Sequence, residues 1–210
     1  MWYDMYGTGR VFCRDCDEKI EQDPAAHAKQ FTRPAVYYDA DFVEDTVAAI
    51  RDLAALCRIN NIKLVVCISP SAQIAYLTTN LERFARFKRE LAGVTGYFDF
   101  SGLNSVNTNP YFYYEPLHYR PLLGDMMLNR IYGKPAIAVP ADFGVYVTAA
   151  TVEAHIRAQC LEVNKLRSTV SLAEVNARFA AFCAQPTRPS AGTTVPASPS
   201  PSRDVGRPGQ

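Results

Sequence analysis

The chain has 210 residues, 48% of them hydrophobic, which suffices for one globular domain with a substantial core. Its formal net charge is +1, and basic and acidic side chains are interspersed along the chain rather than gathered in a basic stripe. These values argue against a surface dedicated to nucleic acid. No apolar window approaches the length of a membrane-spanning helix, and the first residues lack the basic and apolar regions of a signal peptide.

Residues 1–39 carry no clear hydrophobic periodicity and are predicted to be mostly irregular, with one short helix around residues 18–28. They contain the sequence Cys13-Arg-Asp-Cys16. Cysteines at this spacing serve either in thiol–disulfide exchange or as half of a zinc site. Exchange usually places the pair between a strand and a helix, and zinc needs a second Cys or His pair. Neither pattern is evident, so both uses stay alternatives, and no metal or cofactor is expected.

A helix and a buried strand are predicted between residues 41 and 70. Apolar residues at three- and four-residue spacing indicate a helix with one buried face, made of Phe42, Val43, Thr46, Val47, Ile50, Leu53, Ala54 and Cys57. Asp39 or Asp41 can cap this helix, and Asn60 and Asn61 end it. The nearly continuous apolar run over 62–69 is typical of a strand covered on both faces in a parallel sheet. We expect this strand, which contains a buried Cys67, to be the central one.

The next helix is predicted over 81–91, with an apolar stripe of Leu81, Phe84, Phe87 or Lys88, and Leu91. Its charged residues, Lys88 among them, are expected mostly to face solvent. Residues 97–100 form a predicted second strand, and the intervening helix makes a parallel crossover the default. The predicted fold class is therefore α/β, a parallel sheet flanked by helices. Ligands of such sheets bind at the carboxyl ends of the strands, where Ser69 and Ser71 are candidate nucleophiles. Because both serines flank Pro70, turn chemistry is the simpler explanation.

Beyond residue 133 we predict an irregular segment over 134–147 and helices over 148–166 and 171–183. His155 is interpreted as an ordinary residue of the first of these helices. From about residue 185 the chain is rich in Pro, Ser, Thr and Gly, which predicts a disordered tail. The predicted organisation is an irregular segment (1–39), an α/β domain (40–147), C-terminal helices (148–184) and a tail (185–210).

The stretch just before residue 121 places a carboxylate and an imidazole ahead of a predicted helix. Aromatic residues lead into Glu115, and Pro116 favours a loop that contains His118. Pro121 suits the first turn of a helix, and Gly133 suits its end. In a general base, a carboxylate commonly holds one ring nitrogen of a histidine while the other faces substrate. A histidine in a loop also serves commonly as a surface or capping residue, so both interpretations stay open.

Glu115-x-x-His118 followed by Tyr-Arg-Pro-x-x-Gly-Asp resembles the C-terminal Asp-x-x-His block of the SGNH (GDSL-type) hydrolase superfamily, in particular bacterial members of uncertain substrate. The resemblance covers about residues 30–150 and implies a three-layer, flavodoxin-like fold. It implies that His118 is a catalytic base and Glu115 its orienting acid. The implied reaction is hydrolysis of carboxylic esters or transfer of O-acyl groups, on a small ester or an acylated carbohydrate. Relatives of this kind are often membrane-associated or extracytoplasmic.

This chain departs from the SGNH pattern in ways that bear on activity. Glu115 stands where aspartate is usual, and the nucleophile block Gly-Asp-Ser occurs nowhere in the sequence. Ser-Pro-Ser stands near the place of the family's Gly-x-Asn block. Only two strands are predicted, so either residues 1–39 hide strands that lack the usual signals or the opening strand and helix are missing. The resemblance favours the second alternative and implies that the nucleophilic serine is missing with them, so that covalent acyl transfer is lost. The alternatives are a non-catalytic interaction or structural module of the same fold, or a redox or zinc protein using Cys13 and Cys16.

Overall fold

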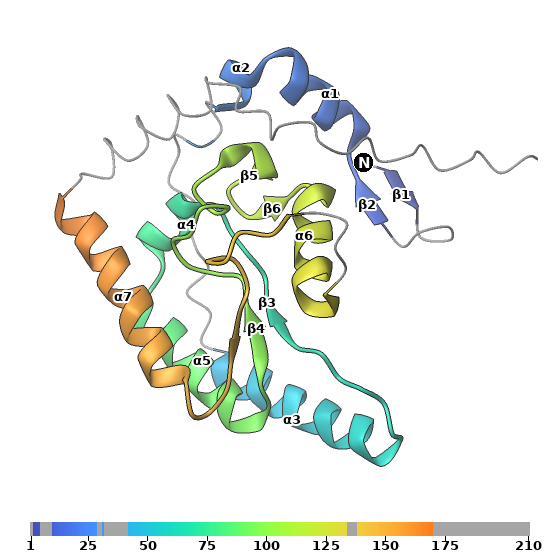
Figure 1. Ribbon diagram of the computed structural model, residues 1–210, viewed down its shortest axis with the longest axis vertical. Coiled ribbons are helices and arrows are strands. Elements are labelled where there is room, and N and C mark those ends of the chain that lie inside the picture. The colour runs from blue at the N-terminus through green and yellow to red at the C-terminus, as the bar shows by residue number, and fades with distance from the viewer. Residues whose placement is uncertain (1, 5–9, 29–30, 32–41, 134–137, 170–210) are drawn as a thin grey trace, which may run out of the picture.

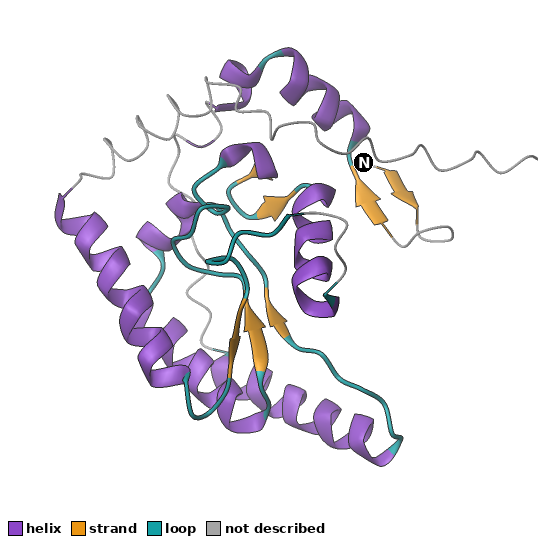
Figure 2. Ribbon diagram, viewed as in Figure 1, coloured by secondary structure: helices purple, strands orange, loops and turns teal. Residues whose placement is uncertain are grey.

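The computed structural model describes residues 2–4, 10–28, 31, 42–133 and 138–169, which form a mixed α/β fold with small sheets (Figure 2). In Figure 1 the central sheet stands between α7 (Val152–Thr169) on one side and α6 (Pro121–Tyr132) on the other. The other helices of the central region are α3 (Val43–Ile59), α4 (Gln73–Thr78) and α5 (Leu81–Val94). The helix predicted over 171–183, the tail and the expected caps Asp39 and Asp41 lie outside the described residues.

The central sheet has the strand order β3-β4-β7, formed by β3 (Cys67–Ile68), β4 (Tyr97–Asp99) and β7 (Val145–Val147). β3 and β4 are parallel, as predicted, but β4 and β7 are antiparallel. The prediction of a purely parallel sheet is therefore wrong, and β4 rather than β3 is the central strand. The sequence did not indicate β7 because the three residues of this strand follow closely on Pro140, in a segment that lacks a long apolar run.

The strand predicted over 62–69 is an edge strand and is shorter than expected. Only Cys67–Ile68 forms β3, although the amide of Phe98 also donates to the carbonyl of Val66 at 2.9 Å. Cys67 is exposed instead of buried. Apolar composition does not distinguish an edge strand from a central one, because both pack side chains against helices.

Successive side chains of β4 point to opposite faces of the sheet and pack in two separate cores, as the pleat of a strand requires. Phe98 packs against the larger core, which includes Phe100 just beyond the strand and Leu123 from α6. Tyr97 belongs to the second core together with Leu91 from α5. The central strand is therefore covered by α6 on one face and by α5 and α7 on the other.

The N-terminal segment is more ordered than predicted. A hairpin of β1 (Trp2–Asp4) and β2 (Arg10–Phe12) is followed by α1 (Arg14–Gln22) and α2 (Pro24–Ala28). Acidic residues in the first turn of α1 favour a helix start, and Pro24 suits the first position of α2. Three-residue strands and a nine-residue helix are too short to produce a clear periodicity, which explains why the segment was predicted to be irregular.

The helix predicted from residue 41 is present as α3, but only part of its predicted face is buried. Val47 and Cys57 are buried, whereas Phe42 is 64% and Leu53 48% exposed. The apolar residues of α3 thus form two stripes, an inner one that packs in the fold and an outer one on the surface. A pattern at helical spacing predicts that a helix is amphipathic without showing how wide its buried face is.

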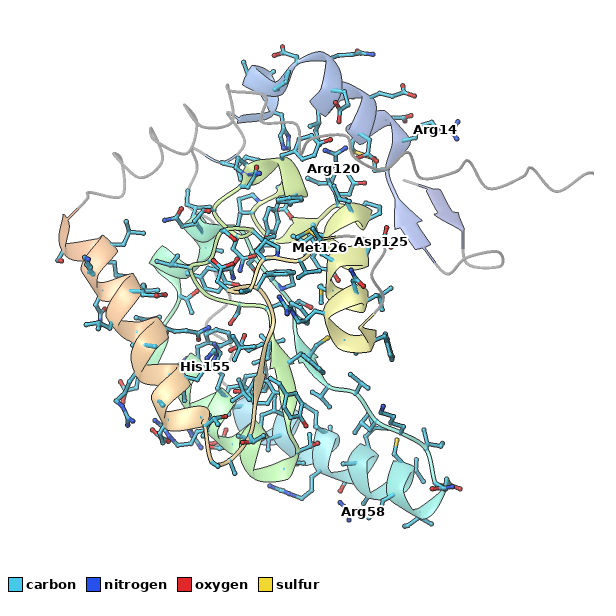
Figure 3. All side chains as sticks on the ribbon, in the orientation of Figure 1. Arg14, Arg58, Arg120, Asp125, Met126 and His155 are labelled. Carbon is cyan, nitrogen blue, oxygen red and sulfur yellow. A yellow bond between two sulfur atoms is a disulfide. The ribbon has the colours of Figure 1, made fainter. Side chains whose placement is uncertain are left out.

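The clearest correction concerns Lys88, which was predicted to face solvent and is 2% exposed. Its ammonium lies 2.8 Å from Asp99 Oδ2 and donates to Ser101 Oγ at 2.8 Å and to Gln159 Oε1. His155 Nε2 lies 2.7 Å from the same Asp99 oxygen, so this histidine is not an ordinary helix residue (Figure 3). The group ties α5, the end of β4 and α7 together.

Burial alone would raise the pKa of Asp99, but the charge on Lys88 and the hydrogen bonds from His155, Lys88 and Ser101 outweigh it, so that this pKa lies well below its usual range. Burial lowers the pKa of Lys88, and Asp99 opposes that effect. The attraction between these two buried charges, together with the hydrogen bonds around them, offsets the cost of removing both from water.

Replacing Asp99 by alanine would leave Lys88 without its countercharge in the core, and we expect the free energy of unfolding to fall by about 3–5 kcal/mol. Urea denaturation measures this loss. In the Lys88→Met/Asp99→Leu double variant both charges are gone, so most of the stability should return. An Asp99→Ala protein as stable as the unmodified chain, or a double variant no better than the single one, would contradict the role given to the pair.

Candidate functional site

Glu115 and His118 lie in a β-hairpin and not in the predicted loop. β5 (Tyr113–Glu115) and β6 (His118–Tyr119) are antiparallel, and Pro116 and Leu117 form the turn between them. A short 3₁₀ helix (Pro110–Phe112) leads into the hairpin, and α6 follows it. The β-prone tyrosines continue as a strand up to Glu115, which the presence of Pro116 had obscured. Pro121 starts α6 and Gly133 ends it with a φ of 66°, both as predicted.

The hairpin register brings the two predicted site residues together. Glu115 pairs with His118 across the strands, and its Oε1 is hydrogen-bonded to Nδ1 of the imidazole. The amide of Leu117 in the turn donates to Glu115 Oε2 at 3.2 Å. Because an ionised carboxylate only accepts hydrogen bonds, the contact requires a proton on Nδ1 and leaves Nε2 of a neutral ring with its lone pair.

The hairpin turn is attached to the chain that leaves the carboxyl end of β3. The amide of Ala72 donates to the carbonyl of Pro116 at 2.9 Å. Burial raises the pKa of the Tyr119 phenol, and Ser69 interacts with this phenol through its side chain. The Glu115–His118 pair therefore stands at the edge of the sheet where ligands of α/β proteins usually bind. The side chain of His118 is 79% exposed, so the imidazole lies on open surface.

The two serines weighed as nucleophiles differ in their surroundings. Ser69 is exposed directly after β3, next to Tyr119, whereas Ser71 is 6% exposed and its amide donates to the Tyr76 hydroxyl at 2.9 Å. A buried serine cannot reach a substrate on the surface. Ser69 is thus the serine that the fold leaves accessible near the hairpin.

The asparagines after β4 hold the loop together through hydrogen bonds to its backbone. Asn107 is fully buried, and its amide group donates to the carbonyls of Phe100 and Gly102 at 2.8 and 3.0 Å. Its Oδ1 accepts from the hydroxyl of Tyr113 at 2.6 Å. Asn107 thereby fixes the position of β5 relative to the end of β4.

A contact that the sequence did not reveal joins α1 to the hairpin through Arg120, the residue after β6. The guanidinium lies 2.7 Å from Asp17 Oδ1 on α1, and its side chain is only 11% exposed (Figure 3). It also donates to the carbonyl of Tyr111 at 3.1 Å and stacks over that ring at 4.4 Å. We call this ion pair and its contacts the Arg120 clasp. The two charges are 103 residues apart in the sequence, so no local pattern could have paired them.

Tyrosine hydroxyls extend the Arg120 clasp on both sides of the ion pair. Tyr114, the neighbour of Glu115, donates to Asp17 Oδ2 at 3.0 Å and accepts from the amide of Cys13 at 3.3 Å. Tyr111 donates to Glu21 Oε1 at 2.8 Å. The helix α1 therefore contacts the chain immediately before Glu115 and the chain immediately after His118.

The two cysteines of the Cys13-Arg-Asp-Cys16 sequence form a disulfide. Cys13 is the N-cap residue of α1, and Cys16 lies in its first turn. In this state the pair has no thiolate to offer a zinc ion. Within the described ranges no group of three or more His, Cys, Asp or Glu side chains is arranged to hold a metal.

The two cavities described in the structure lie along α3 and away from the hairpin. Both are open, with volumes of about 370 and 500 Å³, the first lined in part by Cys57 and Leu64 and the second by Phe42 and Leu53. Neither is lined by His118.

Among the helices that the structure describes, none is both long enough and apolar enough to cross a bilayer.

No known protein family matches this chain, and searches of characterised proteins and of solved structures found no significant match. The site is therefore interpreted from its own geometry.

The hydrogen bond to Glu115 should fix the tautomer of His118. We expect ¹⁵N-resolved NMR of the neutral ring to show the proton on Nδ1, and we expect that preference to disappear in Glu115→Ala. His27 is the matched control, because its Nε2 lies 2.9 Å from the carbonyl of Tyr113, and burial lowers its pKa. Its tautomer should be the same in both proteins. A His118 ring with its proton on Nε2 in the unmodified chain would contradict the geometry.

Proposed function

We propose that His118 and Glu115 are the general base and the orienting acid of an SGNH-type site for ester hydrolysis or O-acyl transfer. The observation that carries this proposal is the hydrogen bond from His118 Nδ1 to Glu115, which leaves the lone pair of Nε2 available on a side chain that is 79% exposed. A second observation supports it, namely the attachment of the hairpin turn at the carboxyl end of β3. The helices on both faces of β4 are compatible with the layered fold of that superfamily.

In this proposal Nε2 accepts the proton of a hydroxyl group as its oxygen attacks an acyl carbon. Glu115 stabilises the imidazolium that forms and keeps the ring in one orientation, while the amide of Leu117 keeps the carboxylate in place. Glutamate serves here where aspartate is usual because the hairpin register sets the two residues side by side, which accommodates one more methylene.

The attacking hydroxyl in this proposal belongs to water or to the acceptor substrate. The sequence has no Gly-Asp-Ser block, and neither Ser69 nor Ser71 stands in a Gly-x-Ser-x-Gly elbow. Without an activated serine the base assists direct attack and does not form an acyl-enzyme. The 79% exposure of the imidazole suits an acyl group attached to a carbohydrate polymer, because a long chain can lie across an exposed surface.

The second candidate function is a non-catalytic interaction or structural module. The observation that favours it is the same 79% exposure of the His118 side chain, since a catalytic imidazole is usually sheltered from bulk water. In that case Glu115 and His118 only stabilise the hairpin turn.

Hydrolysis of p-nitrophenyl acetate separates the two candidates. We expect a slow, His118-dependent rate that falls by about 10²-fold in His118→Ala, the lower range for loss of a general base, with a smaller loss in Glu115→Gln. Glu162→Gln changes an exposed acid on α7 and should leave the rate unchanged. Circular dichroism confirms that each variant is folded. A rate that is the same in His118→Ala as in the unmodified protein would exclude the catalytic proposal.

A further inference from the structure

The Cys13–Cys16 disulfide stands out from the other cysteines of the described chain, where Cys57, Cys67 and Cys160 are free. It lies at the start of α1, and the amide of Asp17 donates to the carbonyl of Cys13 at 2.9 Å. The helix itself already holds the two cysteines within one turn. A disulfide that closes so short a loop removes less conformational entropy from the unfolded chain than one that closes a long loop, so we expect its effect on α1 itself rather than on the whole fold.

The surroundings of the disulfide suit thiol–disulfide exchange. Cys16 is partly exposed and open to attack, whereas Cys13 is 7% exposed at the N-cap of α1. A thiolate at a helix N-terminus is stabilised by the amides and the dipole of the helix, which makes the sulfur of Cys13 a good leaving group. An external thiolate is therefore expected to attack the sulfur of Cys16, and the sulfur of Cys13 is the leaving group.

The disulfide is also connected to the candidate site. The amide of Cys13 donates to the hydroxyl of Tyr114, and the same hydroxyl donates to Asp17, which holds Arg120. Tyr114 precedes Glu115 in β5, and Arg120 follows β6. A change in the first turn of α1 thus reaches both strands of the hairpin through hydrogen bonds of 2.7–3.3 Å.

We propose that Cys13 and Cys16 form a redox-active pair whose reduction loosens α1 from the β5–β6 hairpin and so changes the Glu115–His118 pair. The consequence for catalysis rests on the proposed function of that pair, but the exchange chemistry and the loosening do not.

The reduction is a two-step exchange with a dithiol. A thiolate of the dithiol attacks Sγ of Cys16, the bond between Cys13 and Cys16 breaks, and Cys13 leaves as a thiolate that takes up a proton. The second thiolate of the dithiol then attacks its own sulfur in the mixed disulfide and releases Cys16, which is protonated in turn. Two electrons pass from the dithiol to the protein, and the dithiol becomes a cyclic disulfide.

The experiment uses the whole chain equilibrated with mixtures of reduced and oxidised dithiothreitol under native conditions. Alkylation followed by peptide mass spectrometry reports the fraction of Cys13 and Cys16 that is reduced. Hydrogen exchange on the same samples reports the protection of residues 14–22 and 111–120. We expect reduction without unfolding, and we expect exchange in both segments to become about five-fold faster on reduction, since short helices open locally when an anchor is lost.

Two controls isolate the effect of the disulfide. Exchange in α5 should be the same in both redox states, because α5 makes none of the contacts of the Arg120 clasp. The Cys13→Ser/Cys16→Ser variant should resemble the reduced protein and should not respond to dithiothreitol. Identical exchange of residues 111–120 in the oxidised and reduced protein would overturn the coupling. A disulfide that is reduced only when the protein is denatured would overturn the redox pair itself. Either result stands whether or not the protein hydrolyses esters.

Discussion

The ion pair between Arg120 and Asp17 is the interaction on which the arrangement around the candidate site depends. The side chain of Arg120 is 11% exposed. Its guanidinium lies 2.7 Å from the carboxylate of Asp17, donates to the backbone carbonyl of Tyr111 at 3.1 Å and stacks over the ring of Tyr111 at 4.4 Å. The planar, multidentate guanidinium can make these contacts at once, which a lysine cannot. A nine-residue helix such as α1 is too short to persist alone in water, so its position depends on anchors of this kind.

The hairpin that the Arg120 clasp holds is also fixed by the chain segments that follow β3 and β4. Pro116 accepts a hydrogen bond from Ala72, and Tyr113 donates one to the buried Asn107. Further inside, Lys88 and Asp99 fasten the central strand to two helices. The Glu115–His118 pair is thus attached to the core through buried contacts and to α1 through the polar contacts of the Arg120 clasp. Such an arrangement allows the surface pair to change without disturbing the core.

The sequence predicted the contacts that are local and missed those that are distant. The helix that begins at Pro121 and the nearness of Glu115 to His118 follow from neighbouring residues, and the parallel pairing of β3 with β4 follows from the helix between them. The burial of Lys88 was missed because a lysine in an amphipathic helix faces solvent unless a buried partner exists, and Asp99 enters the core from a separate strand. The Arg120 clasp was missed for the same reason, since its charges are 103 residues apart.

A double-mutant cycle on Asp17→Ala and Arg120→Ala, followed by urea denaturation, tests most directly whether this ion pair holds α1 on the hairpin. A matching cycle on Glu153 and Arg89, a pair with both side chains 49% exposed, provides the reference for an ion pair in solvent. For a partly buried pair with shared partners, the account predicts a coupling free energy of about 1–3 kcal/mol between Asp17 and Arg120, larger than the reference. A coupling that cannot be distinguished from zero would contradict it.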